Sequence, residues 1–220
     1  MYVSELTPTG VTPMTTQSVG GPNINAVGYM KISSQGDKLA LANWTGNSVE
    51  IYNFNILNGA ITHNLSIPNL PNYPYGIEFS NNGRYLYFSC CFITVGGSIY
   101  QQDLTTSSSP ILLRSILPPN ANATAFTSCA LQMSPDKSTI IIAMDGFNQL
   151  GAIINPDSPT ASVNWSYIPL PNLLCTKGLP TFVENSNCEN SCDCDCSCSG
   201  CNKNAEEQNE ELNDRAQAKE

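Results

Sequence analysis

Residues Tyr75 to Cys90 read YGIEFSNNGRYLYFSC, which is the pattern of a β-hairpin. Ile77 and Phe79 flank a polar residue, and after an Asn-Gly turn Leu86 and Phe88 alternate in the same way with tyrosines. Apolar residues at every second position on both sides of such a turn predict two antiparallel strands that are buried on at least one face.

The same pattern occurs twice more, as GYMKISSQGDKLALAN at residues 28–43 and as CALQMSPDKSTIIIAM at residues 129–144. One serine aligns in all three copies, and its occurrences lie 47 and 54 residues apart. Such spacing predicts one supersecondary unit that is repeated along the chain. The aligned serines are Ser33, Ser80 and Ser134, and one polar position on the opposite face holds Lys31, Glu78 and Gln132.

Each copy begins a unit in which two more short strands are expected to follow the hairpin. Units of four antiparallel strands at this spacing are typical of propeller blades, whereas a β-sandwich does not predict registered repeats. We therefore predict an all-β chain, a partial β-propeller of three complete four-stranded blades plus flanking strands. The expected strands are 28–33, 38–43, 48–53 and 60–67 in the first unit, the hairpin at 75–90 with 97–103 and 111–115 in the second, and the hairpin at 129–144 with 149–155 and 163–168 in the third.

Three units do not make a closed ring, because a closed propeller needs at least about four blades. Residues 2–6 are expected to form a single strand, the outer strand of a preceding blade, and residues 178–183 follow the last unit. Three explanations are open: the chain is a fragment of a longer protein, another chain completes the ring, or the termini cap an open array. The first is favoured. The expected organisation is propeller blades over 1–184, a Cys-rich linker over 185–201 and a polar acidic tail over 202–220.

The charge of the chain is concentrated at its C-terminal end. Of 220 residues only 12% are charged, and the formal net charge is −9. Residues 184–220 hold ten of the eighteen acidic and three of the nine basic residues, which leaves a net charge of −2 for the rest. Without a basic cluster we expect no nucleic-acid partner, and without a long apolar run we expect no membrane span. The N-terminus lacks the pattern of a signal peptide.

A cysteine cluster is the sharpest chemical signal in the sequence. Residues 188–201 read CENSCDCDCSCSGC, and the polar run that follows over 202–220 is expected to be a solvated helix or disordered. Thiolates at this spacing would bind Zn or Cu(I), but the same spacing also suits disulfides or a spacer without fixed pairing. Spacing does not choose between the three. The candidate metal ligands are Cys188, Cys192, Cys194, Cys196, Cys198 and Cys201.

Two further groups of residues qualify as candidates for binding or chemistry. Aromatic side chains near expected loops would line a carbohydrate- or peptide-binding face, or fill the gaps between blades. The single histidine and the isolated aspartates do not assemble a catalytic set, since an Asp in a hairpin turn caps its own backbone. We therefore predict no catalytic residues and no bound cofactor, and buried thiols at the vicinal Cys90 and Cys91. The aromatic candidates are Trp44, Tyr52, Tyr73, Tyr75 and Phe147, and the polar residues set aside are Asp37, His63, Asp136 and Asp145.

Several motifs resemble known propellers. The segment IEFSNNGRYLYFS is similar to the blade hairpin of the lactonase-like and WD-type propeller superfamily. AVGYMKISSQGDKLALAN, SVEIYNF, PYGIEFSNNGRYLYFS, LQMSPD, LGAIINP and GLPTF, in this order over residues 8–183, resemble the propeller of large surface proteins of gliding bacteria, commonly cargo of type IX secretion. This resemblance implies an extracellular or cell-surface location, and it defines no site residues.

These observations together lead to one functional expectation and two alternatives. We expect a non-catalytic binding or scaffold module that holds a protein or glycan ligand on the loops at one rim, where turns are displayed on a rigid frame. The alternatives are a lactonase-like hydrolase, which the resemblance implies, and metal binding through the Cys-rich tail.

Overall fold

The computed structural model describes residues 1–13, 15–20, 27–92, 96–106, 108–116 and 128–180. The chain divides into two units, Met1–Ser186 and Asn187–Glu220. The fold below is that of the first unit. The cysteine cluster at 188–201, the tail at 202–220 and the boundary at residue 184 lie outside the described residues, so the expectations for them stay predictions.

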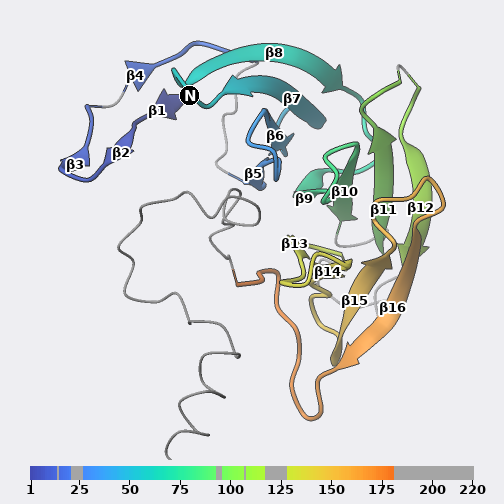
Figure 1. The fold of residues 1–220 in the computed structure, drawn as a ribbon. Helices are drawn as coiled ribbons and strands as arrows, with labels where there is room; N and C mark the ends of the chain where they lie inside the picture. Colours follow the sequence, from blue (N-terminus) through green and yellow to red (C-terminus); the bar gives the residue numbers. More distant parts are fainter. Residues whose placement is uncertain (14, 21–26, 93–95, 107, 117–127, 181–220) are drawn as a thin grey trace, which may run out of the picture. The chain divides into compact units, whose positions relative to one another are not determined.

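Three four-stranded antiparallel sheets confirm the expected propeller blades (Figure 1). In each sheet the strands pair in the order in which they follow along the chain. Blade 1 contains β5 (Met30–Ile32), β6 (Lys38–Asn43), β7 (Ser48–Asn55) and β8 (Ala60–Ile67). Blade 2 contains β9 (Pro74–Phe79), β10 (Tyr85–Phe92), β11 (Gly96–Asp103) and β12 (Ile111–Ile116). Blade 3 contains β13 (Leu131–Met133), β14 (Thr139–Ile142), β15 (Gln149–Ile154) and β16 (Ser162–Pro169).

The repeated serine explains why the first hairpin of every blade turns at the same place. In blade 2 the Ser80 hydroxyl accepts a hydrogen bond from the Tyr85 backbone N–H at 2.9 Å, and the serines of the other two blades do the same. Three residues after the serine the backbone has a positive φ, at Gly36, Gly83 and Lys137. Glycine adopts this conformation without steric cost, and the turn closes with a backbone hydrogen bond to the serine carbonyl.

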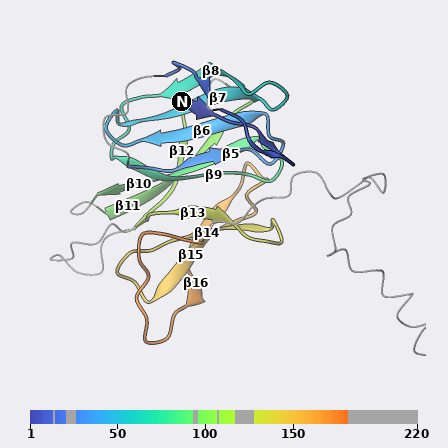
Figure 2. The same cartoon turned by 90° about the vertical axis from the view of Figure 1, so that its left-hand side faces the viewer.

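The core lies between the blades rather than within any one of them. Ile77 and Phe79 of β9 are buried against blade 1, whereas Tyr85 and Tyr87 of β10 are buried against blade 3. Successive strand residues point to opposite faces of a sheet, so the central blade buries both of its faces. Figure 2 shows the three sheets following one another from blade 1 to blade 3.

The N-terminal segment corrects one expectation. Residues 2–6 do not form a single strand. Tyr2–Val3 and Leu6–Thr7 are separate strands, and each pairs with a later part of the same segment because the chain reverses at Gly10, where φ is +133°. The result is a doubled-back ribbon that lies on the face of blade 1 turned away from blade 2. Met1, Val3 and Val19 pack there around the buried Tyr52. The pairs are β1 (Tyr2–Val3) with β4 (Thr15–Thr16), and β2 (Leu6–Thr7) with β3 (Gly10–Val11).

The ribbon leaves the inner strand of blade 1 uncovered. Met30 is 56% exposed and Ile32 is 45% exposed, whereas Ile77 and Phe79, at the aligned positions of blade 2, are 0% and 2% exposed. Ile77 and Phe79 pack against blade 1, whereas no sheet among the described residues takes the corresponding place beside Met30 and Ile32. The described part of the chain contains no helix that is long and apolar enough to cross a membrane.

Candidate functional site

A polar cluster joins the three inner strands. The Lys31 ammonium on β5 donates to a carboxylate oxygen of Glu78 on β9 at 2.8 Å and to the amide oxygen of Gln132 on β13 at 2.7 Å. These are the three residues that the repeat aligned on one face. The side chains of Lys31 and Glu78 are 14% and 3% exposed, so the ion pair is largely removed from water.

The Glu78 carboxylate already accepts several hydrogen bonds within the fold. Besides the Lys31 ammonium, its Oε2 accepts from the Met133 backbone N–H at 3.0 Å, and its Oε1 accepts from the Phe79 backbone N–H at 3.1 Å. A general base must have a lone pair directed at the substrate proton. The Glu78 carboxylate is therefore better suited to a structural ion pair between blades than to the role of a general base. We call this cluster of Lys31, Glu78 and Gln132 the inter-blade ion pair.

A cavity of about 310 Å³ lies at the other end of the inner strands, where β9 begins and where the chain enters β13. Trp44, from the β6–β7 turn, stacks on Tyr73 with ring centres 5.0 Å apart and meets Tyr75 edge-on at 6.2 Å. We call this the aromatic cavity. Its lining residues are Val27, Trp44, Tyr75, Cys91, Cys129 and Lys177.

The chain segment after the last blade builds one wall of the aromatic cavity. The Lys177 carbonyl accepts a hydrogen bond from the Ala130 backbone N–H at 3.1 Å, and the Cys175 N–H donates to the Phe147 carbonyl at 2.7 Å. These bonds hold the exposed Lys177 beside Tyr75 and Cys129 at the cavity. Lys177 is thus positioned by blade 3, although it lies beyond the last strand of that blade.

Two buried thiols contribute to the lining of the aromatic cavity. Cys91 comes from β10 of blade 2, and Cys129 precedes β13 of blade 3. The two side chains are hydrogen-bonded to each other, and this contact together with burial raises the pKa of the Cys129 thiol. Cys90, by contrast, lies in the core between blades 1 and 2, where burial raises its pKa to about 12.

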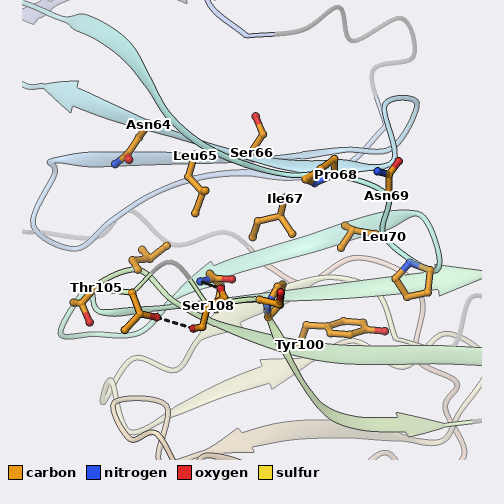
Figure 3. Close-up of a pocket in the computed structure, with 16 residues that line it drawn as sticks. Asn64, Leu65, Ser66, Ile67, Pro68, Asn69, Leu70, Tyr100, Thr105 and Ser108 are labelled. Atoms are coloured by element: carbon orange, nitrogen blue, oxygen red, sulfur yellow. Dashed lines mark hydrogen bonds between the residues drawn. The ribbon is translucent and has the colours of Figure 1, made fainter.

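A second hollow, the inter-blade groove, lies between the outer parts of blades 1 and 2 (Figure 3). Its volume is about 680 Å³. Leu65 and Ile67 of β8 point toward β11, where Tyr100 lies, and the β11–β12 loop closes the groove with hydroxyl-bearing side chains such as Thr105 and Ser108. No charged residue is among the sixteen that line it. The groove therefore offers apolar packing surface and neutral hydrogen-bonding side chains, but no charged group.

The structure brings together three of the five aromatic candidates. Trp44 and Tyr75 line the aromatic cavity, and Tyr73 stacks on Trp44 behind this lining. Tyr52 is instead buried beneath the N-terminal ribbon, and Phe147 packs against the core between blades 2 and 3. These two aromatic side chains therefore pack in the protein core and do not line a binding face.

The polar residues set aside as structural do occupy turns or the surface. Asp37 accepts a hydrogen bond from the Ser33 hydroxyl at 2.8 Å, and Asp136 accepts one from the Ser138 backbone N–H at 3.1 Å. Asp145 lies in a turn, and the His63 side chain is 46% exposed. Among the described residues no three His, Cys, Asp or Glu side chains are grouped so that they would hold a metal ion. The candidate ligands Cys188, Cys192, Cys194, Cys196, Cys198 and Cys201 lie outside those residues.

Sequence reasoning missed Lys177, Val27 and the pairing of Cys91 with Cys129. The vicinal cysteines had been expected to be buried, and both are. The strand register gives the further signal: Cys90 and Cys91 point to opposite faces of blade 2, so one of them faces blade 3. Nothing in the local pattern identifies Cys129 as its partner.

Comparison with protein-family models found no match, and comparison with curated proteins found none either. Solved structures do match. A protein from Lactobacillus plantarum is 17% identical, with a TM-score of 0.52 over 76% of this chain and 50% of that one. The periplasmic gluconolactonase of Pseudomonas aeruginosa is 15% identical, with a TM-score of 0.53 over 74% of this chain and 48% of that one.

A putative 6-phosphogluconolactonase from Bacteroides uniformis is also similar, with 15% identity and a TM-score of 0.50 over 76% of this chain and 52% of that one. The chain thus spans about half the length of the solved structures that it matches. At these identities the similarity establishes the fold alone. The chain therefore has the fold of part of a β-propeller.

Proposed function

We propose that this chain is a non-catalytic binding module that takes a glycan at the aromatic cavity. The observation that carries the proposal is that Trp44, stacked on Tyr73, lines the cavity together with Tyr75 and Lys177 at the end of the inner strands. Aromatic rings offer an apolar face for the C–H groups of a sugar ring, and the phenol and ammonium groups supply hydrogen bonds to its hydroxyls. The cavity volume of about 310 Å³ suits one or two sugar rings.

The location of the cavity also supports a binding role. Its residues come from the turn after β6, from β9 and β10, and from the segment after β16, so a ligand there would contact all three blades. Loops on a rigid frame are the usual place for recognition residues. The paired and hydrogen-bonded carboxylate of Glu78 favours binding over catalysis, because it accepts several hydrogen bonds within the fold.

Tryptophan fluorescence tests the proposal directly, since the chain has two tryptophans and only Trp44 lies at the cavity. Trp165 is buried between blades 2 and 3, so a Trp165→Phe chain reports on Trp44 alone. Titration with glucose, glucuronate and their short oligomers is expected to shift the Trp44 emission for at least one sugar. Binding followed calorimetrically is expected to fall at least tenfold in Trp44→Ala.

The matched control is Tyr167→Ala, which removes an exposed aromatic side chain on β16 outside the cavity. This variant should bind as tightly as the unchanged chain. Equal losses in Trp44→Ala and Tyr167→Ala, or no fluorescence change with any of these sugars, would contradict the proposal.

A lactonase-like hydrolase is the second candidate, and the names of two similar solved structures favour it. The test is the hydrolysis of glucono-δ-lactone, measured by acid release against the spontaneous rate. A binding module leaves the rate unchanged. A rate above the spontaneous one that disappears in Glu78→Gln would replace our first proposal with this one.

We also propose that further propeller sheets cover the open face of blade 1. Met30 and Ile32 take the positions that elsewhere bury against a preceding blade, and the chain spans about half of its structural neighbours. The covering sheets belong either to a longer protein or to another chain.

We further propose that the protein is exported to the cell surface. Digestion of the protein by a protease added to intact cells tests this location.

A further inference from the structure

Cys91 and Cys129 face each other across the boundary between blades 2 and 3. Their side chains are hydrogen-bonded to each other, and both line the aromatic cavity. Cys91 is 1% exposed and Cys129 is 0% exposed, so the contact is between two buried thiols. Neither of them takes part in a disulfide.

The backbone around the pair is held from both sides. The Ser89 hydroxyl on β10 donates to the Cys129 carbonyl at 2.7 Å and accepts from the Gly76 backbone N–H at 2.8 Å. The Cys91 N–H donates to the Tyr73 carbonyl at 3.0 Å. Blade 2 therefore binds the backbone of Cys129 directly, only two residues away from Cys91 on the same strand.

Strand alternation explains why Cys91, and not its neighbour, meets Cys129. Ser89 and Cys91 project from β10 toward blade 3, whereas Cys90 lies in the core shared with blade 1. Cys175 also packs near Cys129, but its sulfur accepts from the Met144 N–H and donates to the Thr176 carbonyl. Among the described cysteines, the Cys91 thiol is the one hydrogen-bonded to the thiol of Cys129.

We propose that Cys91 and Cys129 are an inter-blade dithiol that a low-molecular-weight disulfide oxidises to a disulfide. One thiolate attacks the reagent, breaks its S–S bond and forms a mixed disulfide, and one reagent thiol leaves. The second cysteine then attacks the mixed disulfide at the protein sulfur and releases the second reagent thiol. The two protons lost by the cysteines end on the two released thiols, so the protein is oxidised by two electrons and the reagent is reduced by two.

The product would tie β10 of blade 2 to the chain entering β13 of blade 3 and would change the lining of the aromatic cavity. The groups that face the Cys129 thiol are Cys91, Tyr75, Asp145 and Cys175, and Lys177 lines the same cavity. Because the pKa of Cys129 is raised, the thiolate is scarce at neutral pH. The oxidation is therefore best followed in alkaline buffer.

The experiment uses the full chain with its six tail cysteines replaced by serine, so that four thiols remain. The folded protein is incubated with oxidised glutathione, and its intact mass and unreduced peptide map are recorded. We expect the mass to fall by two hydrogens and the map to show a Cys91–Cys129 cross-link. The oxidised protein should also unfold at a higher urea concentration than the reduced one. Adding a thiol reductant should remove the cross-link and restore the original mass and urea midpoint.

Matched variants assign the reaction. Cys90→Ser and Cys175→Ser should retain the cross-link, whereas Cys91→Ser and Cys129→Ser should lose it. A cross-link between Cys129 and Cys175, or no cross-link in a folded chain whose thiols all react after unfolding, would overturn the proposal. The main readout needs no substitution at the pair and no sugar ligand, so it fails or succeeds independently of the glycan-binding function.

Discussion

The ammonium group of Lys31 lies 2.8 Å from a carboxylate oxygen of Glu78, and this ion pair connects the inner strands of blades 1 and 2. The same ammonium reaches Gln132 of blade 3 at 2.7 Å. One side chain therefore links the inner strands of the three blades. Burial makes the pair costly to break, because the remaining charge would have no water around it.

We predict that Lys31→Met lowers the free energy of unfolding by about 3–5 kcal/mol, because it leaves the Glu78 carboxylate buried without its partner. Urea denaturation measures the loss. Lys38→Met is the control, since Lys38 pairs with the exposed carboxylate of Asp37 and its removal should cost no more than about 1 kcal/mol. Adding Glu78→Gln to Lys31→Met should recover part of the lost stability. Equal losses in Lys31→Met and Lys38→Met would contradict a stabilising role of the ion pair between Lys31 and Glu78.

The aligned residues Met30 and Ile77 provide a second test. Ile77→Ala should lower the free energy of unfolding by about 2–5 kcal/mol, because it leaves a cavity between blades 1 and 2. Met30→Ala should change it by no more than about 0.5 kcal/mol, since that side chain is more than half exposed. Chemical denaturation of both variants measures the two changes in the free energy of unfolding. A large loss in Met30→Ala would mean that another sheet already covers β5 in solution.

Gly76 lies where blade 2 comes close to the backbone of blade 3. A Cβ at this position would lie 2.1 Å from the Cys129 carbonyl oxygen and 2.9 Å from the Leu131 nitrogen. We predict that Gly76→Ala costs at least about 1–3 kcal/mol of stability, because backbone atoms rather than a flexible side chain must move. Gly178→Ala is the control, because its Cβ would meet only the Tyr29 hydroxyl at 3.9 Å, and it should leave the stability unchanged. Thermal unfolding of both variants measures the difference.

The Asp103 carboxylate gives the fold an acid-sensitive contact. A hydrogen bond from the Arg84 guanidinium, at 2.8 Å, and another from Thr105 hold its pKa well below the usual value. A carboxyl whose pKa is lowered by folding contributes stability above its unfolded pKa of about 3.9 and loses it as the pH falls toward the folded value.

Asp103→Asn should therefore be less stable than the unchanged chain at neutral pH, and the difference should shrink below about pH 4. Urea midpoints across this range measure it. A difference that stays constant down to about pH 2 would show that the carboxylate charge contributes nothing.

The six tail cysteines remain a prediction from the sequence. We expect them to form disulfides when the chain is purified without reductant, so that thiol titration of the unfolded chain detects only Cys90, Cys91, Cys129 and Cys175. Elemental analysis measures Zn and Cu on the same sample. Bound metal that chelation removes, with more thiols appearing afterwards, would favour the metal alternative. Neither metal nor disulfides would leave the tail a spacer.

The sequence alone determined the blades, because their signals are local. Alternating apolar residues and a turn that begins at the aligned serine both lie within about sixteen residues of sequence. The structure confirms the hairpin in all three copies. The shared register even placed Lys31, Glu78 and Gln132 at one position. The single strand expected over residues 2–6 was wrong, since so short a pattern does not record whether the chain continues straight or folds back at Gly10.

Only the tertiary structure decided which side chains meet. Trp44 and Tyr73 stack, although a complete strand pair lies between them in the sequence, and Cys91 reaches Cys129 across a blade boundary. Such contacts depend on how one sheet packs on the next, and apolar periodicity records that a residue is buried but not what it is buried against. Sequence therefore specified the repeated unit, and inter-blade packing specified the cavity.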